Sequence, residues 1–432
     1  MNTDPSAGPD ADDRLHGSVV LYMSVAAALG TSTIYPLQPA IADVAQSLDS
    51  RLAAVGLALA CGPAGYLAGL GLLVPLVDRF PPGRVLALQF AVLAGALAVC
   101  AAVDDVWRLG MVTGVVGACS AVGAALSSVA GRFAPPRRRA TILGIVTAGI
   151  SVGILAGRIA GGWLADEIGW RGMVLVFAAS CAVFAASCAV VLPGTRGAGQ
   201  RGYIATLRSL PGLFVRYTEL RVAAICGAMW FFAFCAVWAG LAVALSKPPF
   251  AYSAEQIGLF AAAGLSGIPA ARLAGAWADR VGATRVVVAG LALAGAAATI
   301  AAFTLTDTLV TLVCLALFDA GLFAAQVANQ STVLSIDPAA PARFNSAYML
   351  VYFVGGSLGS AAGAAAVDRF GWAATASLAA AAIGIAAMIV VTTSVRQSRA
   401  TGRYPVPGTG RLGGAVVRGD APGPTDTRPA RP

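Results

Sequence analysis

Long apolar runs, separated by short polar segments, recur along almost the whole chain from residue 17 to residue 393. Most of the runs reach about 20 residues, the length that an α-helix needs to cross the hydrocarbon core of a bilayer. The pattern therefore predicts twelve membrane-spanning helices. They lie approximately at 17–42, 53–77, 84–103, 106–131, 140–164, 170–192, 221–245, 255–278, 284–305, 308–334, 345–367 and 371–393.

The polar segments divide the chain into two sets of six predicted spans. Residues 194–220 form the longest internal polar segment, and the glycines that follow Pro193 are typical of a linker. The predicted organisation is a cytoplasmic N-terminal tail at 1–16, a six-helix half at 17–193, a cytoplasmic linker at 194–220 and a second half at 221–394. The tail at 395–432 is rich in Gly, Pro and Arg, and we expect it to be disordered.

The two halves repeat each other. Asp78-Arg79 follows the second predicted span, and Asp279-Arg280 follows the eighth. The fifth span carries a glycine at every fourth position and is followed by Asp, Gly and Trp; the eleventh span repeats this order. The positions are Gly153, Gly157, Gly161, Asp166, Gly169 and Trp170, and then Gly355, Gly359, Gly363, Asp368, Gly371 and Trp372. Duplicated parallel halves are typical of transporters, and such glycine stripes serve close helix packing, gating or both.

Composition supports a membrane class. The 432 residues are 58% hydrophobic and only 11% charged, whereas soluble domains usually carry about 25% charged residues. A water-soluble protein could not cover its surface with so few polar side chains, but lipid accepts apolar faces on every side. We therefore expect an all-α membrane protein.

The net charge of +9 does not indicate a nucleic-acid partner, because the basic residues lie in short segments between apolar runs and form no basic face. They are concentrated in alternate segments. The intervening segments hold only Arg51, Arg108, Arg171, Lys247 and Arg369. By the positive-inside rule, both termini should face the cytoplasm of a cell with the chain in its inner membrane. No basic region or cleavage site precedes the first run, so we expect it to remain a span.

No pattern of a catalytic or metal site appears in the sequence. The eight cysteines lie within apolar runs and form no CxxC pair, and His16 is the only histidine, so we read the cysteines as packing residues. A P-loop, a nucleophile elbow and a zinc motif are all missing. We therefore expect no enzyme activity, no cofactor, no metal and no direct use of ATP.

Three charged residues fall inside predicted spans, where burying a charge costs at least about 2.5–3.5 kcal/mol. Asp319 lies near the middle of the tenth span, Arg158 toward the outer end of the fifth, and Arg272 about two turns inside the eighth. The two arginines could extend to the headgroups, and Asp319 could form a fixed structural contact. The alternative that we favour is that Asp319, with Arg158 or Arg272 as partner, couples transport to protons.

The segments after the second and eighth spans carry a family resemblance. The second copy, Gly275-Ala276-Trp277-Ala278-Asp279-Arg280-Val281-Gly282-Ala283-Thr284-Arg285, resembles the loop signature of the major facilitator superfamily. The first copy departs from it, with Val74 where glycine is usual and with Pro81-Pro82 in the turn. Asp78 and Asp279 could each face the positive N-terminus of a helix in the other half, spans eleven and five, when the cytoplasmic side closes. The candidate gating residues are Asp78, Arg79, Arg84, Gly275, Asp279, Arg280, Gly282 and Arg285.

A narrower resemblance adds a direction of transport. The run 153–162 resembles the antiporter signature of this superfamily, with Arg158 where proline is usual. With the segments 245–253, 319–331 and 343–360, it is similar to the YnfM-like branch of exporters. That likeness implies a twelve-helix fold of two pseudo-symmetric halves and proton-coupled export of small molecules such as drugs or sugars. Thr113 stands where many proton antiporters of the superfamily have an arginine.

The same resemblance implies a midplane cavity lined by spans one, four, seven and ten. The candidate polar and aromatic residues of this cavity are Tyr35, Gln38, Thr113, Trp230, Phe234, Trp238, Gln326 and Asn329. Aromatic residues of membrane helices more often pack or face lipid, so packing is the alternative for each. The expected partners are a small-molecule substrate, protons and lipid, and we expect a monomer.

Three alternatives to a proton-coupled exporter remain. The chain could be an importer, a sensor that keeps the fold without transport, or a membrane enzyme. A sensor would be expected to carry an additional polar domain, and an enzyme to carry clustered acid–base residues, and neither is present in the sequence.

The predicted orientation can be tested by labelling. Cysteines placed at Ala134 and Ala198 should react with a membrane-impermeant maleimide only from the cytoplasmic side, and one placed at Ala251 only from outside, because Arg-rich segments stay inside. Labelling from the opposite side at any of these positions would contradict the orientation.

Overall fold

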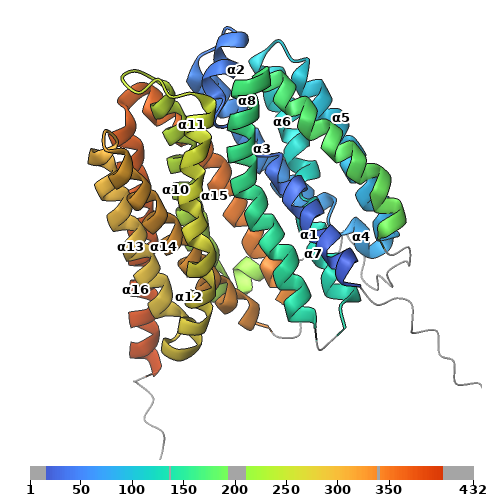
Figure 1. Cartoon of the computed structure of the whole chain (residues 1–432). Coiled ribbons are helices and arrows are strands. Elements are labelled where there is room, and N and C mark those ends of the chain that lie inside the picture. Colours follow the sequence, from blue (N-terminus) through green and yellow to red (C-terminus); the bar gives the residue numbers. More distant parts are fainter. Residues whose placement is uncertain (1–15, 136–137, 193–210, 338–340, 402–432) are drawn as a thin grey trace, which may run out of the picture. The chain divides into compact units, whose positions relative to one another are not determined.

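A computed structural model describes residues 16–135, 138–192, 211–337 and 341–401, and all regular elements within these ranges are helices (Figure 1). The first half contains α1 (Gly17–Ser32), α2 (Ile41–Ser47), α3 (Leu52–Leu72), α4 (Leu76–Arg79), α5 (Pro82–Ala101), α6 (Val106–Ser120), α7 (Val122–Phe133) and α8 (Arg139–Val191). The second contains α10 (Thr218–Ser246), α11 (Ala254–Leu259), the 3₁₀ helix η1 (Phe260–Ser266), α12 (Gly267–Val281), α13 (Ala283–Thr304), α14 (Thr308–Ser335), α15 (Pro341–Phe370) and α16 (Trp372–Thr401).

The twelve predicted spans are recovered in the described residues. Ten helical stretches are long and apolar enough to cross a bilayer, and α1 is a shorter apolar helix. One stretch, Thr141–Val191, has 51 residues, or about 75 Å at the usual rise of about 1.5 Å per residue. It contains two spans, because Gly169 breaks the helical geometry with φ 76° and ψ 157°. The expected all-helical membrane fold of two six-helix halves is confirmed.

The break at Gly169 has an equivalent in the second half. Gly371, between α15 and α16, also has a positive φ of 80°. A residue with a Cβ would be strained in this region, so glycine is required at both turns. The sequence repeat therefore corresponds to a repeat of backbone geometry.

Four spans that the sequence suggested were continuous are interrupted. The second is broken between α3 and α4, next to Pro75. The first helix ends at Ser32, because Pro36 and Pro39 cannot donate helical hydrogen bonds and disfavour helical geometry in the residues before them. The eighth span passes through η1, which ends three residues before Pro269. The fourth is split at Ala121, next to Ser120, whose hydroxyl donates to its own helix at Val116 O (2.7 Å) and so favours a bend.

The two halves contact each other mainly at one end of the bundle. Helices α3 and α15 are in contact, as are α8 with α11 and α2 with α10. At this end the backbones are close enough that a Cβ on Gly56 would collide with Ala364, and one on Gly162 with the carbonyl oxygen of Ala254. Helices α4, α7 and α12, which lie toward the other end, make their main contacts within their own half. We call the end that carries α2 and α11 the closed end.

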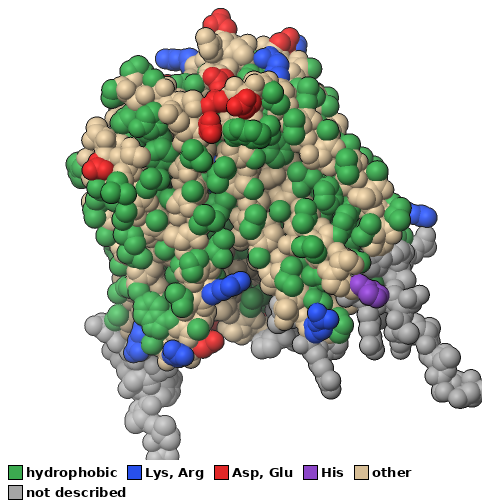
Figure 2. All heavy atoms as spheres, in the orientation of Figure 1, with side chains coloured by type: hydrophobic (Ala, Val, Ile, Leu, Met, Phe, Trp, Pro, Cys, Tyr) green, Lys and Arg blue, Asp and Glu red, His purple; other side chains and the backbone are tan. Residues whose placement is uncertain are grey.

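The surface agrees with a chain embedded in lipid. Apolar side chains cover the middle of the face in Figure 2, and acidic side chains gather at the end that carries α2, the upper end in this view. Many large apolar side chains are exposed, among them Trp107 (68%) and Leu273 (72%). Contact of such a surface with lipid carries no free-energy penalty, whereas its contact with water would be unfavourable.

Several parts of the predicted organisation lie outside the described residues. These are residues 1–15 of the N-terminal tail, 193–210 of the linker region and 402–432 of the C-terminal tail. The chain from Thr393 onward forms a separate unit. Ala134 is only 4% exposed, so exposed Arg138 in the same loop is a better labelling position for the orientation test.

The glycine stripes have a definite packing role. A Cβ on Gly359 would collide with the carbonyl oxygen of Phe232 on α10, and one on Gly157 with that of Ser32 on α1. Gly153, Gly355 and Gly363 approach the same two helices in the same way, and Gly161 approaches the backbone of Pro36 in the segment after α1. The stripes therefore fix the contacts of α8 with α1 and of α15 with α10.

We predict that Gly359→Ala lowers the free energy of unfolding by about 1–3 kcal/mol, the usual cost of an added methyl group that forces the backbone to move. Thermal unfolding of the purified protein in detergent would measure the change. Gly384→Ala is the control, because no atom lies within 4 Å of a Cβ there. Equal effects of the two substitutions would contradict this role of the stripe.

Candidate functional site

The irregular segment after α1 carries two candidate cavity residues. Tyr35 and Gln38 each precede a proline, and neither lies in a helix. Because α1 has ended, the side chain of Gln38 reaches α8, where its Oε1 accepts a hydrogen bond from Arg158 Nε (3.0 Å). The prolines therefore allow a polar contact between the first and fifth spans.

Arg158 is buried, with 4% of its surface exposed. The glycine stripe of α8 packs against α1, so that Arg158, next to Gly157, meets the segment beyond the end of α1. Its guanidinium carbon lies 4.5 Å from the ring centroid of Tyr35, 4.9 Å from Trp238 and 5.9 Å from Phe234. Aromatic faces attract a cation through the ring quadrupole, so these rings offset much of the cost of burying the charge.

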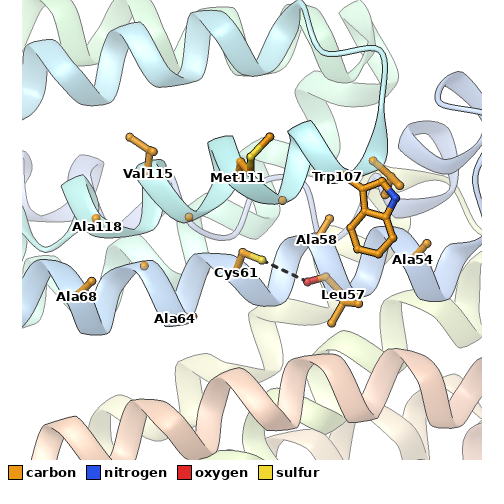
Figure 3. Close-up of a pocket in the computed structure, with 14 residues that line it drawn as sticks. Ala54, Leu57, Ala58, Cys61, Ala64, Ala68, Trp107, Met111, Val115 and Ala118 are labelled. Carbon is orange, nitrogen blue, oxygen red and sulfur yellow. Dashed lines mark hydrogen bonds between the residues drawn. The ribbon is translucent and has the colours of Figure 1, made fainter.

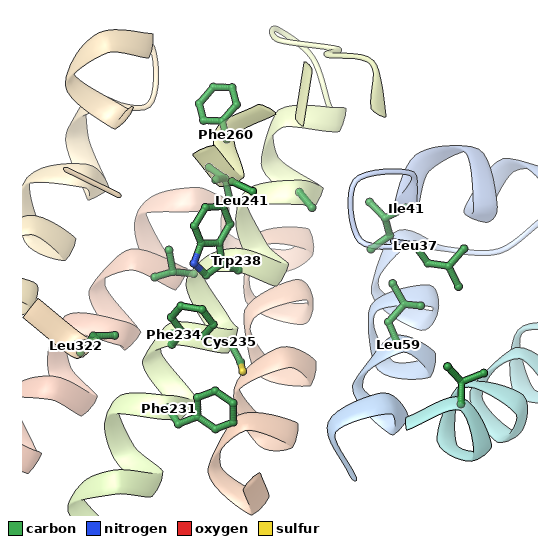
Figure 4. Packing of buried hydrophobic residues seen from close by; sticks show 14 of the residues in the cluster. Leu37, Ile41, Leu59, Phe231, Phe234, Cys235, Trp238, Leu241, Phe260 and Leu322 are labelled. Carbon is green, nitrogen blue, oxygen red and sulfur yellow. The ribbon is translucent and has the colours of Figure 1, made fainter. Parts of the chain in front are cut away.

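Asp319, in the middle of α14, is 1% exposed. Its Oδ1 accepts a hydrogen bond from the indole N–H of Trp238 (3.3 Å). Trp238 follows Phe231 and Phe234 along α10 (Figure 4). The same indole thus contacts Arg158 through its ring and Asp319 through its N–H.

Arg158 and Asp319 interact electrostatically, although they come from different halves and no ion pair within 4.0 Å joins them in the described residues. We call Arg158, Trp238 and Asp319 the charge bridge. It connects the fifth span with the seventh and tenth. The structure therefore brings together two of the three charges singled out in the sequence.

Two residues that the sequence did not single out shape the surroundings of Asp319. A Cβ on Gly264 in η1 would lie 2.8 Å from Asp319 Oδ2 and 2.8 Å from Leu155 on α8. Ser266 Oγ donates to Ala316 O on α14 (2.7 Å). Pro269 in an apolar run was the available signal for an irregular segment here.

Arg272 and Thr113 lie apart from the bridge. Arg272 is exposed on α12, and no hydrogen bond or ion pair of its side chain is recorded in the described chain. Thr113 is buried in the contact of α3 with α6, and its hydroxyl donates to Leu109 O on its own helix (2.7 Å). In this conformation neither contributes to the charge bridge.

The remaining cavity candidates belong to a polar network inside the second half. Gln326 Oε1 accepts hydrogen bonds from Trp230 Nε1 (3.3 Å) and from the hydroxyl of Tyr348 (2.7 Å). Asn329 Nδ2 donates to Ala223 O (3.0 Å) and lies 3.4 Å from the same hydroxyl. The network ties α14 to α10 and α15, and Tyr348, fully buried, is the member that sequence reasoning missed.

The candidate gating residues lie at the end opposite to the closed end. Asp78 is 3.9 Å from Arg132 of α7, within the first half. Asp279 and the arginines Arg79, Arg84, Arg280 and Arg285 are exposed, and Gly282 provides the turn after α12 with φ 92°. Gly275 faces Val327 of α14. Within the described residues, the expected contacts of Asp78 with span eleven and of Asp279 with span five are not among the recorded interactions, and α4, α7 and α12 make their main contacts within their own half.

At the closed end, Asp166 joins the halves. Its carboxylate accepts the backbone N–H groups of Ala254 (3.1 Å) and Glu255 (3.0 Å), which open α11. A carboxylate at a helix N-terminus satisfies free N–H groups and meets the positive end of the helix dipole. Partial burial, and to a lesser extent the charge of Asp166, raise the pKa of Asp43 on the neighbouring α2 above its usual value.

The repeat is asymmetric at this point. Asp368 occupies the position of Asp166 in the second half, but it pairs with Lys247 Nζ (2.7 Å) at the end of α10. That ion pair lies within one half and does not join the two. The duplicated Asp was visible in the sequence, but its two different partners were not.

A small cavity lies between the halves, and a larger groove lies within the first half. The small cavity, of about 10 Å³, lies beside Gln38 and Ser360 and has about the volume needed for a single water molecule. The groove, of about 570 Å³, lies between α3 and α6, and Figure 3 shows its apolar lining with Trp107 at one end. It is lined by exposed residues such as Met111 (67%), so it is a lipid-facing groove away from the charge bridge.

Comparison with known proteins gives a consistent family. The profile of the Major Facilitator Superfamily matches residues 20–246. The chain is 30% identical to the uncharacterized transporter YgaY of Escherichia coli O157:H7 over 83% of this chain and 91% of that protein. It is 31% identical to the probable transporter SCO4007 of Streptomyces coelicolor, over 81% of each chain.

Solved structures share the fold at lower identity. A mutant of the nucleoside transporter NupG matches with a TM-score of 0.70 at 12% identity, over 86% of this chain and 99% of that one. A bacterial homolog of the human lysosomal transporter Spinster, in an inward-facing, unoccupied conformation, matches with a TM-score of 0.67 at 15% identity, over 88% of this chain and 95% of that one.

We predict that Asp166→Asn loosens the closed end, because the amide is a weaker acceptor for the N–H groups of α11. A negative charge at a helix N-terminus contributes about 0.3–1 kcal/mol, and its loss corresponds to a roughly 2- to 5-fold change in the ratio of closed to open molecules. Spin labels at exposed Gln46 and Thr306, one in each half, would show a longer distance by pulsed EPR. Asp368→Asn is the matched control, and a longer distance in that variant alone would contradict the role of Asp166.

Proposed function

The chain belongs to the Major Facilitator Superfamily, and we propose that it is a secondary transporter that exports small molecules in exchange for protons. Its membrane fold and its transporter relatives give the coarser part of this function, a non-enzymatic transporter with multiple membrane spans. The direction and the coupling ion are the proposed parts. The charge bridge is the observation on which they rest.

The charge bridge has the properties that proton coupling requires. Asp319 is a carboxylate in the middle of a span, away from bulk water, so gain or loss of a proton changes a charge in a poorly screened environment. Its nearest opposite charge, Arg158, belongs to the other half. Protonation therefore changes an attraction between the halves. Alternating access moves one half against the other, so this attraction affects the transport motion.

The bridge also explains how an empty carrier would avoid uncoupled cycling. When Asp319 is ionised and no substrate is bound, its attraction to Arg158 through Trp238 holds the halves together on the closed-end side. A proton or a substrate that neutralises Asp319 removes this attraction and lets the closed end open. Only loaded carriers would then change sides, as exchange requires.

In the proposed orientation, the closed end faces outward and both termini face the cytoplasm. The alternation of Arg-rich and Arg-poor segments supports this orientation, and we propose that the structure corresponds to the inward-open form of an inner-membrane protein. On the return step, Asp78 and Asp279 would approach the N-termini of α15 and α8 and close the cytoplasmic side. We propose that one chain suffices for the cycle.

Transport by the Asp319→Asn variant tests this function. We predict that a proton gradient no longer drives accumulation of substrate in everted vesicles, because the amide cannot take up or release the proton. Exchange of substrate across the membrane should continue when the substrate is present at saturating concentration. The substrate would come from a screen of labelled sugars and fluorescent drugs, with and without the gradient.

Asp104→Asn is the control for loss of one carboxylate, since Asp104 is an exposed loop residue paired with Arg108. A variant at Asp319 that folds normally and still concentrates substrate with the gradient would show that Asp319 is not the proton site.

A further inference from the structure

The surroundings of Arg158 have the form of a binding site for an organic cation. Three aromatic rings from both halves, Tyr35, Trp238 and Phe234, surround a planar guanidinium at 4.5 to 5.9 Å. Aromatic cages of this kind recognise cationic ligands. Here the cage holds a cation that belongs to the chain itself.

The two charges of the bridge are unequally satisfied. Arg158 has the three rings, Gln38 at 3.0 Å and the Ile154 carbonyl of its own helix at 3.4 Å. Among the described residues, the hydrogen bond recorded for the Asp319 carboxylate is the one that Trp238 donates, at 3.3 Å. A buried carboxylate with so few donors favours a proton or a positively charged group nearby. The site would thus be stabilised by an additional positive charge near Asp319.

The proposed exchange of substrate for protons also indicates the charge of the substrate. In exchange transport, substrate and proton must exclude each other, and the carboxylate of the bridge is the group on which they can compete. A cationic substrate would compete with the proton for Asp319. An anionic substrate would instead bind Arg158 better once Asp319 is protonated, and would travel together with the proton.

We infer that the substrate is an organic cation with a planar or aromatic body, which displaces Arg158 from the aromatic cage and replaces the proton at Asp319. This inference rests on the proposed exchange with protons. Trp238 is then the residue that recognises the substrate, through its ring face and through its hydrogen bond to Asp319.

Other groups near the site do not supply an equivalent negative charge. The other titratable side chains that interact with Arg158 are Tyr35 and Cys235. Among the described residues, the other charged side chains of the helices packed against α14 are not recorded as interacting with Asp319. They are Glu219, Arg221, Arg272, Asp279, Arg280, Arg285, Arg343, Asp368 and Arg369. Any competition between cation and proton in this region therefore reports on Asp319.

Three small probes with the same aromatic body test the inference: benzamidine, a cation; benzamide, which is neutral; and benzoate, an anion. Binding to the purified full-length protein would be measured by calorimetry at pH 6 and pH 8. We expect benzamidine alone to bind, with an affinity that rises with pH by up to about tenfold per unit while Asp319 is protonated. Binding should release protons into a weakly buffered solution.

Asp319→Asn should abolish the pH dependence and weaken binding at least tenfold, and Asp104→Asn should leave both unchanged. Trp238→Leu should weaken binding more than Trp238→Phe, which keeps a ring. Preference for benzoate or benzamide, or no binding of any probe, would overturn the cation inference.

Failure of the cation inference can be separated from failure of the proposed function. Benzoate binding with uptake of protons that requires Asp319 would keep Asp319 as a proton site and reject the cation. Benzamidine binding without proton release, unchanged in Asp319→Asn, would overturn the competition on which this inference rests. Loss of gradient-driven transport in the vesicle experiment judges the proton site whatever the charge of the substrate.

Discussion

A buried arginine and a buried aspartate, held in different halves of one helical bundle, impose the main constraint on this structure. Neither can reach water, and each would be costly to leave alone in an apolar environment. The indole of Trp238 lies against the guanidinium and donates to the carboxylate, so it connects the two without a direct ion pair. Because the two charges belong to different halves, their energy depends on how the halves are arranged. A change in the protonation of Asp319 is thereby linked to movement of one half against the other.

The backbone around the bridge is built to bring these side chains together. Prolines end α1 early, so that Tyr35 and Gln38 lie outside the helix and contact Arg158. The glycines of α8 let that helix approach α1 and the segment after it closely. Gly264 leaves space for the Asp319 carboxylate beside the 3₁₀ segment. Irregular backbone of this kind is tolerated in a membrane only where protein surrounds it. The interruptions of the first and eighth spans therefore coincide with the candidate site.

The sequence predicted the twelve spans, the duplicated halves and the depth of Asp319. The lengths of the apolar runs, the repeated motifs and the positions of isolated charges can be read from it directly. The interruptions at Ser32 and η1 were not predicted: prolines within these apolar runs were the available signal, but apolar run length alone does not separate a continuous helix from a broken one. Asp166 and Asp368 occupy equivalent positions in the repeat, yet only Asp166 joins the two halves. The sequence did not indicate the roles of Tyr348 and Gly264, because these roles depend on neighbours that are distant in sequence.

The central claim is that ionised Asp319 holds the closed end together through Arg158, and its most direct test is the distance between the halves as pH changes. Pulsed EPR between labels at Gln46 and Thr306 in lipid nanodiscs would report this distance. The account predicts that the distance lengthens on acidification of the otherwise unmodified protein, and that Asp319→Asn shows the longer distance at every pH. A distance that responds to pH equally in both proteins, or that does not respond in either, would contradict the claim.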